Sequence, residues 1–276
     1  MQGFMSLNKI NLNLMLETAV AAARLAGRLA LKEQNHLKVS VKNGDEIVTQ
    51  ADGLCQQLII KKIGDRFPEH GFIAEEGKGG KIFKQPPKNS QQIWWVIDPI
   101  DGTNNFAHRM PLFSVSIAAM KDGYPIAGVI YEPATDSMFT AIKDGVARLN
   151  GKRICATDEP LGRFSSVALD SYFDKKVAAW ACKILQMTKF RNLGSTAIHL
   201  AYTAKGSLAA GIFSHAKLWD IAAGALIAES AGAVVSDWNG EQIFPVNLDS
   251  YSGQRFKVVA ANKKAHSKII KLINTP

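Results

Sequence analysis

The chain has 276 residues, of which 47% are hydrophobic and 21% charged, and its formal net charge is +9. These are the values of an ordinary soluble globular protein with one large domain or two small ones. The apolar runs are too short to span a membrane and the lysines and arginines form no basic tract, so we expect neither a membrane nor a nucleic-acid partner. Solubility and an anionic substrate account for the charge.

The cysteines and the N-terminal region favour a cytoplasmic chain. Cys55, Cys155 and Cys182 are odd in number and widely spaced, which is typical of reduced thiols rather than of a disulfide framework. The first 16 residues contain three asparagines and no small-residue cleavage site, which is not typical of a signal peptide.

The first elements predicted are a helix and a hairpin. Apolar residues recur at helical spacing over residues 11–33, and two alternating segments then flank a tight turn at Asn43-Gly44. Lys42 and Asp45 beside this turn are interpreted as hairpin decoration.

Carboxylates mark the next two elements. Asp52 precedes an apolar helical pattern that stops at Pro68, where the ordinary role of an aspartate is to cap the helix. Residues 72–74 predict a short strand that ends at Glu75 and Glu76. Such a pair can begin a solvated loop, but its place after a buried strand favours a source of metal ligands.

The central motif is the turn at residues 98–103, Asp-Pro-Ile-Asp-Gly-Thr, which follows an apolar run of strand length. Asp98 therefore sits where a buried strand reaches the surface, the usual place for chemistry in α/β sheets. The proline turn lets Asp98 and Asp101 converge and leaves the Ile100 carbonyl free to accept, which is a set of oxygens suited to a hard cation.

The backbone after this turn predicts an anion site, because close-set N–H groups can bind a phosphate. These groups belong to Gly102, Thr103 and Asn104. Two alternative interpretations apply to this motif. Asp-Pro and Asp-Gly are common turn dipeptides, and the aspartyl-phosphate phosphatases have a similar motif, but with aspartates two apart rather than three and near the N-terminus.

The remaining chain shows two patterns. Residues 78–90 predict a loop, and turn signals at short intervals over residues 112–149 predict an antiparallel meander. Beyond residue 158, we expect strands at 167–169, 208–213, 233–236 and 258–261 and helices at 174–187, 196–206, 221–231 and 266–273. A boundary at about 155–162 divides an N-terminal α+β half, residues 1–158, which carries most metal ligands, from a C-terminal α/β half, residues 159–276, which completes the site.

Single polar residues in the second half have ordinary explanations. Asp220 lies at the start of a helix, where an aspartate is a common cap. His199 and His215 lack the spacing of a metal pair, so each is interpreted as structural or exposed.

Together these segments resemble the inositol monophosphatase family of magnesium-dependent, lithium-sensitive phosphatases. Its superfamily includes fructose-1,6-bisphosphatases and 3′-phosphoadenosine-5′-phosphate phosphatases. The resemblance covers roughly residues 12–262 and rests on four blocks in family order: Asp45-Glu46-Ile47-Val48-Thr49 with Asp52, Glu75-Glu76, residues 95–106, and Trp219-Asp220-Ile221-Ala222-Ala223-Gly224. The block at residues 95–106 is the most specific.

The resemblance implies an active site with two to three Mg²⁺ ions. One ion would be held by Glu75, Asp98 and the Ile100 carbonyl. A second would be held by Asp98, Asp101 and Asp220, and a weaker third would lie near Glu75, bound largely through water.

It also implies catalytic and substrate-binding residues. Glu75 and Thr103 would position and deprotonate the attacking water, with Asp52 orienting the Thr103 hydroxyl. The residues implied in phosphate and substrate binding are Asp101, Gly102, Thr103, Asn104, Thr196, Phe213 and Asp220.

The implied fold is α/β, a five-layer αβαβα sandwich of the sugar-phosphatase type, with an antiparallel sheet in the first half and mixed α/β structure in the second. Members of the family are commonly homodimers. Inositol-specific members place an acidic residue seven positions before Asp220, where this chain has Phe213, although Ser214 and His215 could offer polar contacts nearby. Thr196 stands where the family often has Ala, and Gly77 where Ser is usual.

We therefore expect a Mg²⁺-dependent phosphate monoester hydrolase of the inositol-1-monophosphatase type, acting on inositol phosphate or a related small sugar or polyol phosphate. The alternative substrates are 3′(2′),5′-bisphosphate nucleotides, fructose-1,6-bisphosphate and histidinol phosphate. A hypothesis of a different class is a regulatory protein that binds transcription or RNA machinery, as some bacterial members of this family do.

Overall fold

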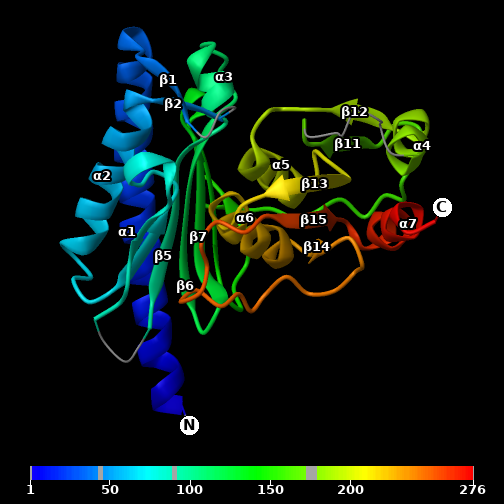
Figure 1. The fold of residues 1–276 in the computed structure, drawn as a ribbon. Coiled ribbons are helices and arrows are strands. Elements are labelled where there is room, and N and C mark those ends of the chain that lie inside the picture. The colour runs from blue at the N-terminus through cyan, green and yellow to red at the C-terminus, as the bar shows by residue number, and fades with distance from the viewer. Residues whose placement is uncertain (1, 43–45, 89–91, 172–178, 276) are drawn as a thin grey trace.

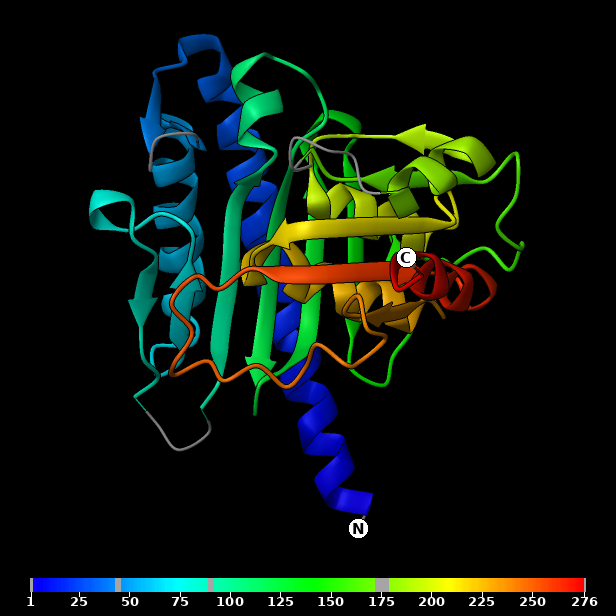
Figure 2. The same cartoon turned by 45° about the vertical axis from the view of Figure 1, so that its right-hand side comes forward.

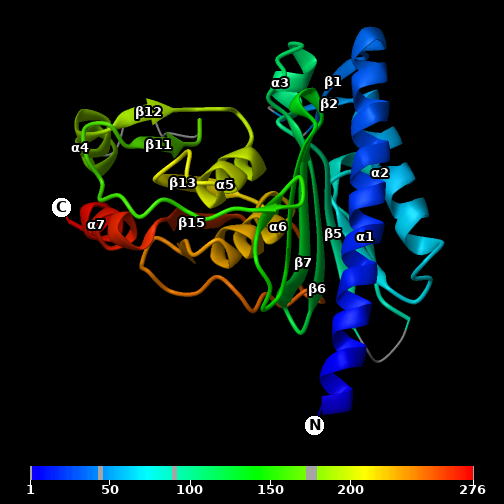
Figure 3. The same cartoon turned by 180° about the vertical axis from the view of Figure 1, so that it is seen from behind.

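The computed structural model describes residues 2–42, 46–88, 92–171 and 179–275, with side chains from residue 12 onward. Five layers follow one another across the molecule (Figure 1). They are two helices, an eight-stranded sheet, two further helices, a five-stranded sheet and a last helix pair, so the predicted αβαβα sandwich is confirmed. Seen from behind, α1 runs along the outer face of the larger sheet (Figure 3).

The first layer is formed by α1 (Gln2–Glu33) and α2 (Gln50–Gly64), which pack on one face of the larger sheet. Between them in sequence lies the hairpin of β1 (Val39–Lys42) and β2 (Glu46–Thr49), which is confirmed as antiparallel. Its predicted turn at Asn43-Gly44, with Asp45, lies outside the described residues.

The larger sheet has the order β10-β9-β8-β7-β6-β5-β3-β4, and every pairing in it except β3 with β5 is antiparallel. Its strands are β3 (Gly71–Ala74), β4 (Phe83–Gln85), β5 (Trp94–Asp101), β6 (Ser114–Lys121), β7 (Tyr124–Glu132), β8 (Ser137–Ile142), β9 (Arg148–Leu149) and β10 (Lys152–Arg153). The predicted meander is thus confirmed. The register of β5 against β6 shifts between Asp98 and Asp101, an irregularity that suits the imino nitrogen of Pro99 and redirects the side chains around it.

The smaller sheet has the order β12-β11-β13-β15-β14 and mixes parallel with antiparallel pairs. Its strands are β11 (Ser166–Leu169), β12 (Lys189–Arg191), β13 (Ala210–Ala216), β14 (Val234–Ser236) and β15 (Phe256–Ala261). Figure 2 shows β13 and β15 running across the direction of the strands in the larger sheet. Since this sheet begins only at residue 166, the topology suits the two predicted halves, whose status as separate domains stays a prediction.

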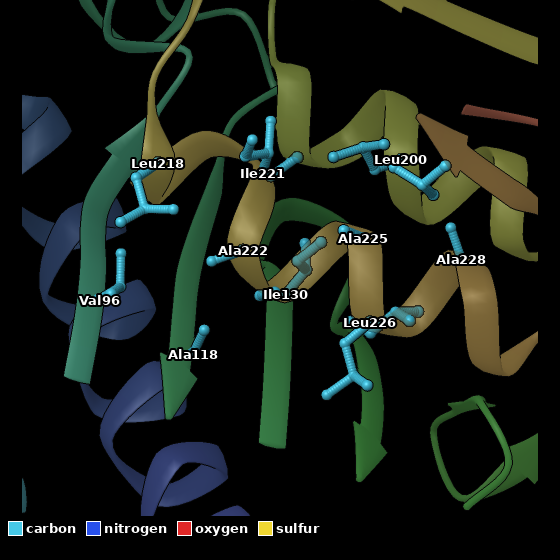
Figure 4. Close-up of a cluster of buried hydrophobic side chains, with 14 of the residues drawn as sticks. Val96, Ala118, Ile130, Leu200, Leu218, Ile221, Ala222, Ala225, Leu226 and Ala228 are labelled. Carbon is cyan, nitrogen blue, oxygen red and sulfur yellow. The ribbon is translucent and has the colours of Figure 1, made fainter. Parts of the chain in front are cut away.

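The layer between the sheets consists of α5 (Thr196–Ala204) and α6 (Leu218–Ser230), and its side chains form one core with both sheets. The close-up in Figure 4 shows Val96, Ala118 and Ile130 of the larger sheet facing α6. A Cβ on Gly128 of β7 would lie 2.9 Å from the Ala223 carbonyl oxygen, so the two backbones approach closely. This tight packing fixes the start of α6 beside the end of β5.

The outer layer is α4 (Ala179–Met187) and α7 (Lys263–Ile273), which cover the other face of the smaller sheet. The first part of the helix predicted at 174–187 lies outside the described residues. Among the residues with a described placement, no helix is both long and apolar enough to cross a membrane.

Two predictions of local structure were wrong. The loop predicted at 78–90 contains β4, and β12 was not predicted; both are edge strands of three residues without a fully buried side chain, so neither carries a hydrophobic pattern. Thr49, not Asp52, is the N-cap of α2, and Asp52 is the third helical residue of a capping box with it.

Candidate active site

Three carboxylates converge where β5 ends and α6 begins. Oxygens of Asp98, Asp101 and Asp220 lie within 4.8 Å of one another. The turn itself holds Asp98, whose Oδ1 accepts from the Ile100 N–H at 3.0 Å. Asp220 Oδ2 accepts from the Lys217 N–H at 2.7 Å. Asp220 therefore both caps α6 and joins the cluster, so the two interpretations of this residue are compatible.

Burial has the largest effect on the pKa values of this cluster. It raises the pKa of Asp98 and of Asp220 well above the usual value for aspartate, and the neighbouring carboxylates raise both further. Burial also raises the pKa of Asp101 to about 6. Hydrogen bonds from Ser195 and from the Ala197 N–H act in the opposite direction and limit this rise. Such a cluster favours a cation, and an all-oxygen donor set is the one that Mg²⁺ prefers, so the residues present fit a magnesium site.

Glu75 directly follows β3 and lies outside the group of three converging carboxylates. It lines the same cavity as Asp98, and the Lys42 Nζ lies 2.8 Å from its Oε1. The same ammonium lies 2.5 Å from Glu76 Oε1, while the Gln56 side chain bonds both the N–H and the carbonyl of Glu76. The interpretation of Lys42 as hairpin decoration was therefore wrong, because it pairs with two acidic residues more than 30 positions along the chain.

The glycine at position 77, where the family usually has serine, is explained by steric crowding. A Cβ there would lie 2.5 Å from the carbonyl oxygens of Lys81 and Ile82. The loop after Glu76 folds back too tightly for a side chain.

A second group of residues meets at Thr103. Its Oγ1 lies 3.1 Å from Asp52 Oδ1 and 2.9 Å from the Ile100 carbonyl oxygen. Asp52 is fully buried, accepts from both the N–H and the hydroxyl of Thr49, and has its pKa raised to about 6 by burial. Asp52 does not line the cavity, and its link to the cavity is the Thr103 hydroxyl.

The predicted anion nest begins at Gly102, whose φ of +92° is the left-handed conformation that favours glycine. The short helix α3 (Thr103–Ala107) starts there, so the first N–H groups of that turn have no partner within the helix. Gly102, Thr103 and Asn104 all line the cavity with the carboxylates. The predicted nest and the carboxylates therefore lie in the same cavity.

The opposite wall comes from the start of α5. Ser195 donates a short hydrogen bond to Asp101 Oδ2 and also caps α5 by accepting from the Ile198 N–H. The Ala197 N–H donates to the same oxygen at 2.7 Å, and Thr196 lines the cavity. Ser195 was missed as a site residue, although a serine before an alanine-rich helix is the pattern of an N-cap.

The three clustered aspartates, Glu75, the nest and Thr196 line one cavity of about 210 Å³. Beyond the carboxylates and the nest, its outer wall is polar and is formed by Glu46, Asp170, His215, Lys217 and Arg255. The Lys217 Nζ lies 3.0 Å from Glu46 Oε1 and the Arg255 Nη2 lies 3.3 Å from the same oxygen, which ties the β1-β2 hairpin to the second half of the chain. His215 was expected to offer a polar contact near the substrate. The other four were not predicted as site residues, because each acquires its position only from the fold.

One predicted substrate residue is not in the cavity. Phe213 is fully buried, and its ring stacks on that of His199 with centroids 5.7 Å apart. The prediction that Phe213 contacts substrate was therefore wrong, since its side chain belongs to the core between the sheets. His199 is buried and accepts from the Leu193 N–H, and His215 is exposed, as their interpretation as structural or exposed residues expected.

The fold and the site together define a layered α/β protein with an acidic, oxygen-lined metal position next to an anion nest. The sequence profile described as the inositol monophosphatase family matches residues 11–275. The chain belongs to this family, and so to the phosphatases of the inositol monophosphatase superfamily.

Individual relatives agree with this assignment. The inositol-1-monophosphatase of Mesorhizobium japonicum is 34% identical over 271 residues, which cover 96% of each chain. The Nus factor SuhB of Escherichia coli K12 is 34% identical over 237 residues, or 82% of this chain and 86% of that protein. Among solved structures, the Thermotoga maritima IMPase superimposes with a TM-score of 0.81 at 29% identity, over 94% of this chain and 96% of that one.

Proposed function

We propose that this chain is a Mg²⁺-dependent phosphate monoester hydrolase of the inositol-1-monophosphatase type, acting on inositol phosphate or a related small sugar or polyol phosphate. The observation that carries the proposal is the convergence of Asp98, Asp101 and Asp220 within 4.8 Å. A phosphate nest lies in the same cavity. Metal-assisted phosphoryl transfer needs both features together.

The metal-holding residues are Glu75, Asp98, the Ile100 carbonyl, Asp101 and Asp220, with two to three Mg²⁺ ions. When bound, the ions would lower the pKa of water and neutralise charge on the phosphate and on the leaving alkoxide. The Ile100 carbonyl keeps a lone pair for this role, because among the described residues the one side chain that donates to it is that of Thr103.

Side chains of the protein then orient the attacking water and accept its proton. A hydroxyl donates one bond at a time, so when Thr103 donates to Asp52 its oxygen lone pairs are free to accept from the attacking water. Glu75 is the base that takes the proton of that water. The N–H groups of Gly102, Thr103 and Asn104 hold the phosphate oxygens in place throughout.

The lining of the cavity favours a sugar or polyol over a nucleotide. A base would need an exposed aromatic face, yet Phe213 is in the core, and Trp219, although it lines the cavity, is 2% exposed. Trp238 packs against Trp180 with ring centroids 5.2 Å apart and does not line the cavity. The 3′(2′),5′-bisphosphate nucleotidase alternative is therefore weaker. Fructose-1,6-bisphosphate and histidinol phosphate stay as alternative substrates.

A second candidate function comes from the names of relatives. Several proteins 34% identical to this chain are Nus factors, so a role with transcription or RNA machinery is the alternative of a different class. The intact carboxylate cluster supports catalysis instead. Copurification of nucleic acid or polymerase subunits with negligible turnover would favour the regulatory role.

Further features of the proposal are a homodimer, a cytoplasmic location and inhibition by lithium. The free thiols of Cys55, Cys155 and Cys182 suit a reducing compartment. Family membership supports the homodimer and the lithium sensitivity. Light scattering of the purified protein tests the homodimer, and the phosphate-release assay below tests inhibition by lithium.

The test of the proposal is phosphate release from a panel of inositol-1-phosphate, 3′-phosphoadenosine-5′-phosphate, fructose-1,6-bisphosphate, histidinol phosphate and glycerol-2-phosphate. Each is measured with Mg²⁺, with Mg²⁺ plus Li⁺, and with EDTA. Turnover of polyol phosphates that is lost in EDTA and lowered by Li⁺ is expected. Inactivity on the whole panel in Mg²⁺ would refute the proposal.

A further inference from the structure

We infer that Asp170 determines substrate specificity by accepting a hydrogen bond from a hydroxyl of the alcohol that leaves the phosphate. This inference rests on the proposed function, because it names the part of the same cavity that receives the leaving group. Four features of the described residues carry it.

The first feature is position. Asp170 directly follows β11, whose Leu169 pairs in register with Ile212 of the parallel strand β13. The Asp170 N–H donates to the Ile212 carbonyl oxygen at 3.3 Å, which continues the ladder by one residue. The carboxylate therefore stands at the end of two neighbouring strands, and it lines the same cavity as the phosphate nest.

The second feature is that its neighbours on β13 hold this carboxylate in one orientation. The Ser214 N–H lies 2.5 Å from Asp170 Oδ2, and the Ser214 Oγ lies 3.0 Å from Oδ2 and 3.2 Å from Oδ1. Ser214 Oγ is also 2.7 Å from the His215 Nδ1. A chain of hydrogen bonds thus runs from His215 through Ser214 to Asp170, and preorganised groups of this kind give specificity.

The third feature is that the Asp170 carboxylate can accept further hydrogen bonds. A carboxylate offers about four acceptor positions. Within the part of the chain that the structure describes, the side chain of Asp170 accepts only from Ser214, and Oδ1 receives only the shared hydroxyl. Asp170 is half-buried and lines the cavity, so a substrate hydroxyl can reach it.

The fourth feature is that the neighbouring strand β13 supplies no carboxylate to this wall of the cavity. Phe213 is fully buried against His199, and the β13-β15 register shifts between Phe213 and Ala216. That irregularity brings His215 and Lys217, not residue 213, to the cavity. The carboxylate on this wall therefore comes from Asp170, directly after β11.

A fixed carboxylate selects by chemistry in two ways. It accepts from hydroxyl groups, and it repels a second phosphate or a carboxylate placed on the same side. The substrate class it fits is the monophosphate of a neutral polyhydroxylated alcohol.

The experiment compares two substrates that share the phosphate but differ in the leaving group: inositol-1-phosphate, which has hydroxyls, and phenyl phosphate, which has none. Asp170→Ala is expected to lower kcat/KM for inositol-1-phosphate by about 10- to 100-fold, mainly through KM, because a hydrogen bond to a charged group is lost. Turnover of phenyl phosphate should stay within about threefold. Asp158→Ala is the matched control, since this aspartate is exposed and pairs only with Lys264 among the described residues.

Four results would overturn the inference. An equal loss on both substrates would show that Asp170 supports the fold or the chemistry instead. No loss on either substrate would show that it does not contact the leaving group. Wild-type protein that hydrolyses neither substrate in Mg²⁺ would contradict the inference, and inactivity on the rest of the phosphate panel as well would refute the proposed function. Activity on phenyl phosphate alone would refute only the inference.

Asp170→Asn keeps the test decisive if the alanine variant does not fold. Its amide has the same size and can still accept through one oxygen. A smaller loss, again confined to inositol-1-phosphate, is the expected result, and an equal loss on both substrates would contradict it.

Discussion

Replacing Asp220 by asparagine separates the energetic penalty of the carboxylate cluster from its function. The amide oxygen can still accept from the Lys217 N–H, so the cap of α6 is kept. What is lost is one negative charge among three whose oxygens lie within 4.8 Å. The variant should therefore be more stable than the wild type without metal, yet unable to use metal.

The size of the effect follows from Coulomb's law. Two unit charges 4.8 Å apart at an effective dielectric constant near 20 repel by about 3 kcal/mol. Burial raises the pKa of Asp220 well above its usual value, so protonation already relieves part of this repulsion. We expect Asp220→Asn to raise the free energy of unfolding by about 1 to 3 kcal/mol in EDTA.

The assay is urea unfolding at pH 8 in EDTA and again in Mg²⁺. Mg²⁺ at 100 times its dissociation constant should stabilise the wild type by about 2.7 kcal/mol, and the variant by much less. Asp65→Asn is the control, because this exposed residue pairs only with Lys61 among the described residues and should change stability by less than about 0.5 kcal/mol. A variant that is less stable than the wild type in EDTA and gains equally from Mg²⁺ would refute the reasoning.

Three further predictions concern single residues. Thr103→Val removes the hydroxyl that links Asp52 to the cavity, so kcat should fall about 100-fold or more with KM little changed, and Thr103→Ser should restore it; activity within threefold of the wild type would contradict this role. Gly77→Ala places a Cβ 2.5 Å from two carbonyl oxygens and should lower the free energy of unfolding by about 1 to 3 kcal/mol; an unchanged urea midpoint would exclude the steric argument. Burial lowers the pKa of His199 to about 4. Between pH 6.5 and 4 the unfolded chain therefore binds more protons than the folded chain, and the free energy of unfolding decreases as the pH is lowered. From pH 7.5 to 5 the wild type should lose about 2 kcal/mol more than His199→Gln, and parallel pH curves would show that this histidine does not titrate on unfolding.

Local sequence patterns predicted the parts of the site that lie on one segment. The apolar run before Asp98 defines β5 along its whole buried length, and the motif after it provides two carboxylates, a carbonyl and the nest within a few residues. The place of Asp220 before a helix predicted a cap, and its part in a metal site was implied by the family resemblance. The structure shows Asp220 capping α6 and lying in the carboxylate cluster. Periodicity and turn chemistry act over short distances, so patterns of this kind can be seen in a sequence.

Residues whose partners lie far along the chain could not be predicted in this way. Lys42 meets Glu75 33 positions later, and Asp170 meets Ser214 44 positions later. Phe213 seemed to face substrate because counting along the chain says nothing of which side of a strand a residue occupies once the register shifts. Such placements depend on tertiary packing, which a single sequence does not display.

The most direct test of the central claim is phosphate release from inositol-1-phosphate by the wild type and by Asp98→Asn, each first stripped with EDTA and then supplied with Mg²⁺. Asp98 is buried among the other carboxylates, and the asparagine keeps its shape and its bond from the Ile100 N–H. The account predicts that the stripped wild type is inactive, that Mg²⁺ restores it, and that Asp98→Asn stays inactive at every Mg²⁺ concentration. Turnover by the stripped wild type, or substantial turnover by Asp98→Asn, would contradict it.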